Sequence, residues 1–262
     1  MKKKLPIIIA LILVLGIGGV LVAKNKSKPE PEQPAEQKTK KKRITEPVNV
    51  IDVAQRPYMS VKPAGTNNIV VAVNQLNKPA TEMEYELEYQ SGSLLQGAFG
   101  QIEVTELPVT EKILLGSCSA GGACTYHKDV TGGKLLTRFT GGEEKYILQS
   151  EWRYYENNAD GKYSSRDAKF QLETEDLSGY VIVANSPGYP EGLEKAVISD
   201  IYSLGAASLN GSGQLSIRAA AESATATIMG YDGTEWTEFE TTVEGKVASA
   251  EVELMELYLV VE

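Results

Sequence analysis

The sequence predicts an all-β domain that follows a single transmembrane helix. First, Met83-Glu-Tyr-Glu-Leu-Glu-Tyr89 alternates apolar with acidic residues, which is typical of a strand with one buried face. Second, similar short runs recur along the chain, and most are separated by the turn-forming residues Gly, Asn, Asp or Pro. Third, Leu5–Ala23 is apolar and carries no charge, unlike the rest of the chain. Helical periodicity is nearly absent outside this segment.

The apolar segment predicts an uncleaved signal anchor. At about 1.5 Å per helical residue, Leu5–Ala23 covers nearly the ~30 Å hydrocarbon core of a lipid bilayer. Residues 1–4 would then form a basic cytoplasmic tail. A cleaved signal peptide is the main alternative, although its apolar region usually spans only about 7–15 residues. Bulky Leu21 also disagrees with a small-x-small cleavage site. A buried helix of a soluble domain is a further alternative.

Residues 24–46 predict an extended linker, because three prolines lie among Lys, Glu and Gln. Residues 1–43 carry 11 basic and 3 acidic residues, a net charge of +8. Residues 44–262 carry 15 basic and 32 acidic residues, a net charge of −17. Each basic side chain near an anionic surface contributes about 1 kcal/mol of attraction. We therefore expect the linker to lie against anionic lipid or wall polymer, and a solvated linker is the alternative.

Two signals disagree about the side of the membrane on which the domain lies. Eight Lys or Arg residues follow the apolar segment within twenty positions and three precede it, which favours a cytoplasmic domain. However, long domains cross the membrane largely regardless of charge, and a cysteine pair suits an oxidising compartment. We therefore predict an extracytoplasmic domain on a single-pass membrane protein.

Two β-sandwich domains are expected, at residues 47–186 and 187–262. The boundary follows from Ser186–Gly192, the densest cluster of Pro and Gly in the folded part. Both halves end on a similar aromatic and aliphatic run, Gly179–Val183 and Leu257–Val261. Strands are predicted at 68–76, 83–89, 100–107, 111–117, 134–140, 145–155, 169–175 and 179–185.

The C-terminal residues carry a resemblance to a known family. In residues 231–262, a Tyr-Asp-Gly turn precedes Trp236, and an aromatic and aliphatic strand ends the chain. This pattern resembles the terminal hairpins of Ig-like or fibronectin-type modules in bacterial cell-surface proteins. The resemblance covers about 30 residues and implies that both domains are Ig-like antiparallel sandwiches.

Cys118 and Cys124 predict a local disulfide. Five small residues separate them between two strand-like runs, so the two thiols can meet across a loop. Closing such a loop stabilises a fold by roughly 2 kcal/mol. A metal site with His127 and a pair of reduced, inert thiols are the alternatives, although structural zinc requires four ligands at tighter spacing. His127 is the only histidine, so any His-dependent catalysis would need it.

One loop has the oxygen spacing of a calcium site. Its candidate ligands occupy loop positions 1, 3, 5, 9 and 12 with Gly at position 6. These residues are Glu156, Asn158, Asp160, Ser164 and Asp167. Position 1 is Glu and position 12 is Asp, opposite to the usual pattern, and the flanks are strand-like. An Asn-Asp-Gly hairpin loop explains the same residues.

Trp152 and Tyr154 form a candidate stacking platform for a ligand such as a sugar ring. In a strand both side chains lie on one face. Core packing is the alternative, because one face of the strand must fill the interior.

The sequence favours a binding or structural role, as an adhesin, an envelope spacer or a subunit of a membrane complex. A tethered hydrolase of envelope polymers, with carboxylates that the sequence does not identify, is one alternative. A cytoplasm-facing assembly factor is another. No cofactor motif is recognised, and an unknown protein or glycan is the expected ligand. A domain with net charge −17 is unsuited to nucleic acid, because phosphates repel it.

Overall fold

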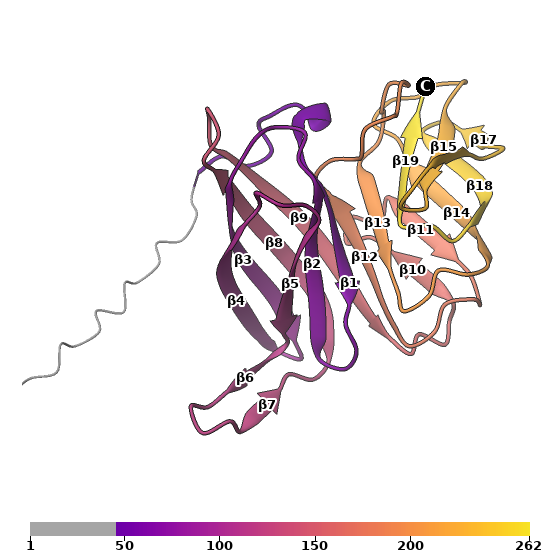
Figure 1. Ribbon diagram of the computed structural model, residues 1–262. Helices are drawn as coiled ribbons and strands as arrows, with labels where there is room; N and C mark the ends of the chain where they lie inside the picture. Colours follow the sequence, from indigo (N-terminus) through magenta and orange to yellow (C-terminus); the bar gives the residue numbers. More distant parts are fainter. Residues whose placement is uncertain (1–45) are drawn as a thin grey trace, which may run out of the picture. The chain divides into compact units, whose positions relative to one another are not determined.

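Antiparallel strand pairing organises residues 46–262, the part of the chain that the computed structural model describes (Figure 1). One sheet runs through this whole part and is called the long sheet here. Its strands, from edge to edge, are β16 (Trp236–Glu238), β15 (Thr227–Tyr231), β19 (Leu257–Val261), β13 (Ile201–Gly205), β12 (Tyr180–Ser186), β9 (Tyr146–Glu156), β8 (Val130–Thr140), β3 (Glu82–Ser91) and β4 (Leu94–Glu103).

Two smaller sheets cover parts of the long sheet. The first cover sheet contains β1 (Tyr58–Pro63), β2 (Asn68–Gln75) and β5 (Val109–Leu114). The second contains β10 (Lys162–Ser164), β11 (Phe170–Glu173), β14 (Ser212–Arg218), β18 (Val247–Glu253) and β17 (Thr242–Glu244). A hairpin of β6 (Gly116–Cys118) and β7 (Cys124–Tyr126) follows β5. A 3-10 turn at Val53–Gln55 precedes β1.

The first core lies between the first cover sheet and the strands β3, β8, β9 and β12. Its residues come from alternate positions, such as Met83, Tyr85, Leu87 and Tyr89 on β3. Burying such side chains stabilises the fold by about 1.5–3 kcal/mol each. The Met83–Tyr89 alternation therefore predicted the correct buried face.

The second core lies on the opposite face of the long sheet. Val181 and Val183 of β12 pack there with the second cover sheet, whereas Ile182 and Ala184 belong to the first core. Successive side chains of a strand point to opposite faces, so β12 is buried on both. This explains why its sequence is a continuous apolar run and does not alternate.

The pairing of strands bears on the expected boundary between two sandwich modules. The expected boundary after residue 186 falls between β12 and β13, which pair as neighbours in the long sheet. Gly179–Val183 and Leu257–Val261 likewise contribute to one sheet, as β12 and β19, with only β13 between them. The two cores therefore share a sheet, because apolar residues on both faces of β12 each need cover.

The predicted anchor at Leu5–Ala23 and nearly all of the predicted linker lie outside the described residues. In the described part of the chain, no helix is both long enough and apolar enough to span a bilayer.

Candidate binding surface at the β4 edge and the disulfide hairpin

Strand β4 is the end strand of the long sheet. Among the described residues its sheet neighbour is β3, which lies on one side of it. The nine residues Leu94–Ile102 carry no charge, although 23% of the chain is charged. The side chains of Leu94, Leu95 and Phe99 are 62%, 65% and 67% exposed. Most proteins protect such an edge with charges, prolines or bulges, so an apolar edge of this length indicates a contact surface.

Two glycines allow β4 to pair closely with β3. Gly100 lies directly opposite Tyr85, and a Cβ atom added at Gly100 would be 2.5 Å from the Tyr85 hydroxyl oxygen. The Tyr85 ring therefore lies over Gly100, and its hydroxyl donates a hydrogen bond to Glu111 Oε1 (3.2 Å). Burial, and then the nearby Glu111 carboxylate, raises the pKa of Tyr85 to about 12. Gly97 lies opposite Glu88 and leaves the face of β4 that points away from the first core without a side chain at that position.

The β3–β4 hairpin is strongly acidic on the face away from the first core. Glu82, Glu84, Glu86 and Glu88 alternate with the core residues of β3. Glu82 also lies directly opposite Glu103 of β4, an arrangement in which like charges repel. Arg138 of β8 forms an ion pair with Glu84 (3.2 Å).

Glu46, at the start of the described chain, lies on this face. It forms ion pairs with Arg138 and Lys145. These contacts, above all the hydrogen bond from Lys145, lower the pKa of Glu46.

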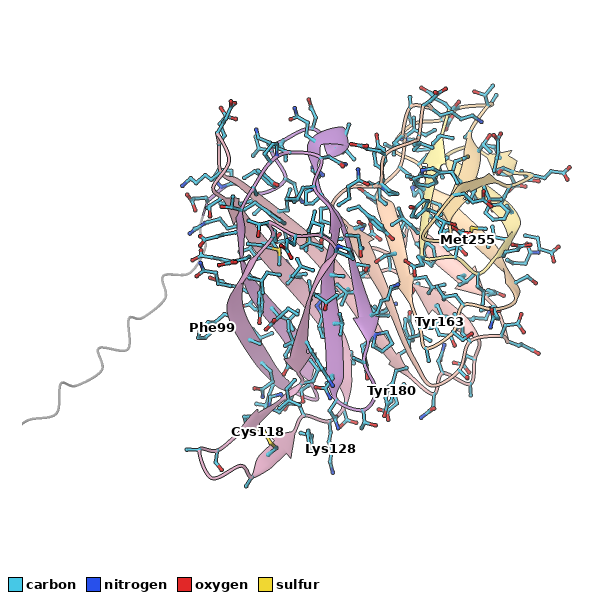
Figure 2. All side chains as sticks on the ribbon, viewed as in Figure 1. Phe99, Cys118, Lys128, Tyr163, Tyr180 and Met255 are labelled. Atoms are coloured by element: carbon cyan, nitrogen blue, oxygen red, sulfur yellow. A yellow bond between two sulfur atoms is a disulfide. The ribbon has the colours of Figure 1, made fainter. Side chains whose placement is uncertain are left out.

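The β6–β7 hairpin extends beyond the strands of the first core (Figure 1). Cys118 and Cys124 face each other across it and form a disulfide, with Cα atoms 4.0 Å apart (Figure 2). The predicted disulfide is thus confirmed. Both cysteines and Tyr126 are exposed, and the Tyr126 side chain is 52% exposed. The disulfide fixes the conformation of a loop that has little core of its own.

Polar contacts join the base of this hairpin to the β3–β4 hairpin. The Tyr89 hydroxyl lies 2.8 Å from His127 Nδ1. At the β3–β4 turn, the Gly92 amide donates to the Asp129 carbonyl (3.0 Å), and the Ser91 hydroxyl donates to the Lys128 carbonyl (2.7 Å). The start of β4 and the hairpin base are therefore held together. His127 has a structural contact here.

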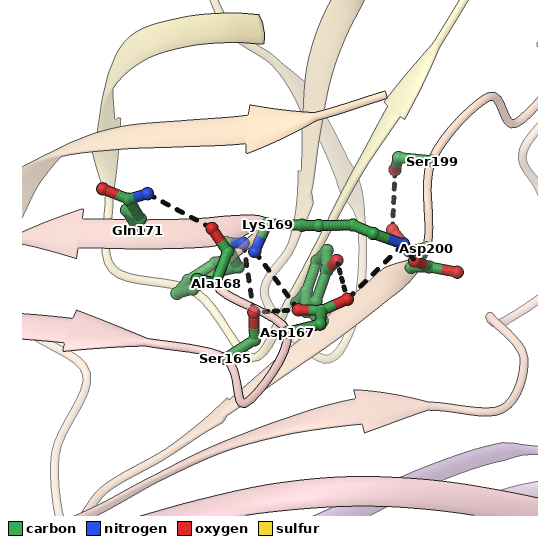
Figure 3. Close-up of polar contacts among 9 residues, drawn as sticks. Ser165, Asp167, Ala168, Lys169, Gln171, Ser199 and Asp200 are labelled. Atoms are coloured by element: carbon green, nitrogen blue, oxygen red, sulfur yellow. Dashed lines mark hydrogen bonds and ion pairs between the residues drawn. The ribbon is translucent and has the colours of Figure 1, made fainter. Parts of the chain in front are cut away.

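A polar site lies in a cavity of about 220 Å³ that residues of β9, the β10–β11 loop and the segment between β12 and β13 line. Asp167 and Asp200 both line it, and Lys169 Nζ lies 3.6 Å from Asp167 Oδ2 and 2.7 Å from Asp200 Oδ2 (Figure 3). The Tyr202 hydroxyl donates to Asp167 Oδ2 (3.3 Å), and burial raises the pKa of Tyr202. The ion pair of Lys169 with Asp200 and the hydrogen bond from Tyr202 join the β10–β11 loop to β13 and the residue before it. We interpret this cluster, called the clamp here, as a structural contact that holds the β10–β11 loop against the start of β13.

The calcium-loop candidates lie along the β9–β10–β11 segment and have separate partners. Asn158 Nδ2 donates to the Lys162 carbonyl (2.8 Å), which closes a hairpin loop. The Ser164 hydroxyl accepts a hydrogen bond from Arg153, and Asp167 belongs to the clamp. Glu156 ends β9, and Asp160 lies in the loop that follows. In the described part of the chain, no group of three or more His, Cys, Asp or Glu side chains is arranged to hold a metal ion.

The aromatic candidates Trp152 and Tyr154 lie in the first core, where they are 0% and 8% exposed. Their rings meet edge to face, with centroids 6.5 Å apart. The neighbouring Tyr155 packs against the second core. The two rings that share a face are therefore occupied by packing within the protein.

No protein-family model, curated protein or solved structure matches this chain. Sequence reasoning missed the β4 edge, because its strand was predicted at 100–107 and the observed strand is Leu94–Glu103. The uncharged run Leu94–Ile102 could have indicated the edge. Its two glycines and its lack of apolar–polar alternation do not resemble a strand pattern.

Proposed function

We propose that this protein is anchored in a membrane by Leu5–Ala23 and binds a partner outside the cytoplasm. Its binding surface would comprise β4 and the β6–β7 hairpin. The observation that carries the proposal is where apolar side chains are exposed. Of the seven large hydrophobic side chains exposed within residues 46–262, four lie on β4 or this hairpin: Leu94, Leu95, Phe99 and Tyr126. Exposed apolar groups gathered in this way favour association with another molecule.

The disulfide supports the proposed compartment. Disulfides persist outside the reducing cytosol, and an exposed pair in a cytosolic protein would be reduced. Protease added to intact cells should therefore degrade the domain, and the mass of the isolated protein should rise on reduction. A domain that stays protected until lysis, or a mass that reduction leaves unchanged, would contradict the proposed location.

Position-specific crosslinking in the native membrane tests the proposed surface. A photoreactive amino acid would replace Leu95 or Tyr126, with Val50 as the control, since its side chain is apolar and 75% exposed but lies outside the surface. We expect a discrete crosslinked adduct from positions 95 and 126 and none from position 50. Equal adducts at all three positions, or none at 95 and 126, would contradict the proposal.

A further inference from the structure

We propose that β4 binds an extended, basic segment of a partner polypeptide, which adds to the long sheet as a further strand. This inference rests on the proposed function and specifies the chemistry of its partner. Three features of the protein support it: the geometry of the β4 edge, the charge of the β3–β4 hairpin, and the side chains of β4 that an added strand would contact.

The geometry of the edge is that of a template for strand addition. β4 is ten residues long and pairs with β3 over its whole length, from Ser91↔Leu94 to Glu82↔Glu103. The backbone of an end strand offers N–H and C=O groups on its outer side, and a partner strand gains affinity by pairing with them. The run Leu94–Ile102 contains no proline or charged residue to oppose such pairing.

Charge decides which occupant fits this edge. Five acidic residues share one face of the β3–β4 hairpin, Glu82, Glu84, Glu86, Glu88 and Glu103, and no Lys or Arg lies between Pro79 and Glu103. On β8, Arg138 lies opposite Glu84 and Lys134 opposite Glu88, so this face keeps an acidic excess of three. A second copy of the chain would bring an equal set of carboxylates to the same edge, which is unfavourable. A basic segment would instead relieve the repulsion between Glu82 and Glu103, which lie directly opposite each other.

The side chains of β4 leave room for basic groups of the added strand. Strands lie about 4.8 Å apart, so the β3 glutamates would be roughly 10 Å from the added strand. An extended lysine reaches across much of that distance. On this face β4 presents Leu95, Gly97, Phe99 and Gln101, and Gly97, opposite Glu88, places no side chain between Glu88 and the added strand. The methylene stems of basic residues would pack against the exposed side chains of Leu95 and Phe99. The added strand would therefore alternate basic residues on the acidic face with apolar residues on the other.

The test uses the purified full-length protein in detergent and a designed probe peptide. The probe has about ten residues, the length of β4, and alternates lysine with valine. One comparison peptide has the same sequence with alternate backbone nitrogens methylated, which preserves the charge but removes donors for strand pairing. A second alternates glutamate with valine. Binding is measured by fluorescence anisotropy, and strand addition by hydrogen exchange of the β4 amides.

We expect the lysine probe to bind and to slow exchange along Leu94–Ile102. The methylated peptide should bind at least about tenfold more weakly, because several backbone hydrogen bonds are lost. Gln101→Lys on β4 should weaken probe binding by about threefold to tenfold through like-charge repulsion. The matched control is Gln214→Lys, an exposed glutamine on β14 of the second cover sheet, which should bind the probe unchanged.

Four outcomes would overturn the inference. Equal binding of the methylated peptide would mean ionic attraction without strand addition. Preference for the glutamate peptide would refute the charge argument, and concentration-dependent protection of β4 without peptide would identify a second copy as the occupant. Crosslinks from positions 95 and 126 without probe binding would refute this inference but leave the proposed function standing. Probe binding without crosslinks would instead refute the proposed function in the native membrane and support only the capacity of β4 to accept a basic strand.

Discussion

At the scale of single residues, burial raises the pKa of several tyrosines, and this makes the stability of the fold depend on pH. Tyr85 is 5% exposed in the first core, and its hydroxyl reaches Glu111. Both burial and the carboxylate disfavour the phenolate, so the pKa of Tyr85 rises to about 12. The same direction holds, through burial, for Tyr58, Tyr146, Tyr154 and Tyr258. The fold therefore contains many phenols that must stay protonated.

We predict that alkali destabilises the protein. Below pH 10, the ordinary pKa of tyrosine, Tyr85 is protonated in both states and its full contribution to stability is present. Between pH 10 and about 12 the unfolded state releases the proton first, so the free energy of unfolding falls. Urea unfolding measured across this range should show the fall, and Tyr85→Phe should show a smaller one. An identical slope in the variant would refute the role of Tyr85.

At the scale of elements, two glycines bring three strands together. The register of β3 and β8 shifts at Gln90, where β8 presents Gly132 and Gly133. A Cβ atom added at Gly133 would be 1.8 Å from the Glu88 carbonyl oxygen on β3. One added at Gly132, where φ is +113°, would be 2.2 Å from the Trp152 carbonyl oxygen on β9. Neighbouring backbones thus approach β8 from both sides, which only glycine permits.

Gly133→Ala is predicted to lower the free energy of unfolding by about 3 kcal/mol, because a backbone atom cannot move aside. The matched control is Gly121→Ala in the β6–β7 loop. There an added Cβ would meet only the Ser119 hydroxyl, at 3.9 Å. That variant should lie within about 0.5 kcal/mol of the parent. Urea denaturation of both proteins measures the difference, and similar losses would contradict the close approach at β8.

At the scale of the whole described domain, the shared sheet joins the two cores. β12 contributes Ile182 to the first core and Val183 to the second. β19 is buried along its whole length, because Tyr258 and Val260 face the second core and Leu257, Leu259 and Val261 belong to a third, smaller cluster. Removing either cover sheet would expose one apolar face of a central strand. The two cores should therefore gain and lose structure together.

We predict one cooperative unfolding transition for the domain. Leu148 in the first core and Leu172 in the second are both fully buried, so replacing either with alanine should cost about 2–5 kcal/mol. In calorimetry each variant should shift the same single transition to lower temperature. If Leu148→Ala shifts one transition and Leu172→Ala another, the cores unfold independently and the shared sheet does not couple them.

The all-β class, the buried face of β3 and the disulfide of Cys118 with Cys124 were predictable from the order of residues alone. These features depend on local order, since a period of two marks a half-buried strand and a short spacing lets two thiols meet. By contrast, the pairing of β12 with β13 in one sheet and the position of β4 as its end strand are visible only in the folded chain. Strand neighbours are chosen by packing between residues far apart in the chain, which local periodicity does not record. Leu94–Ile102 can be identified as an edge strand only because, among the described residues, β3 is its one neighbour in the sheet.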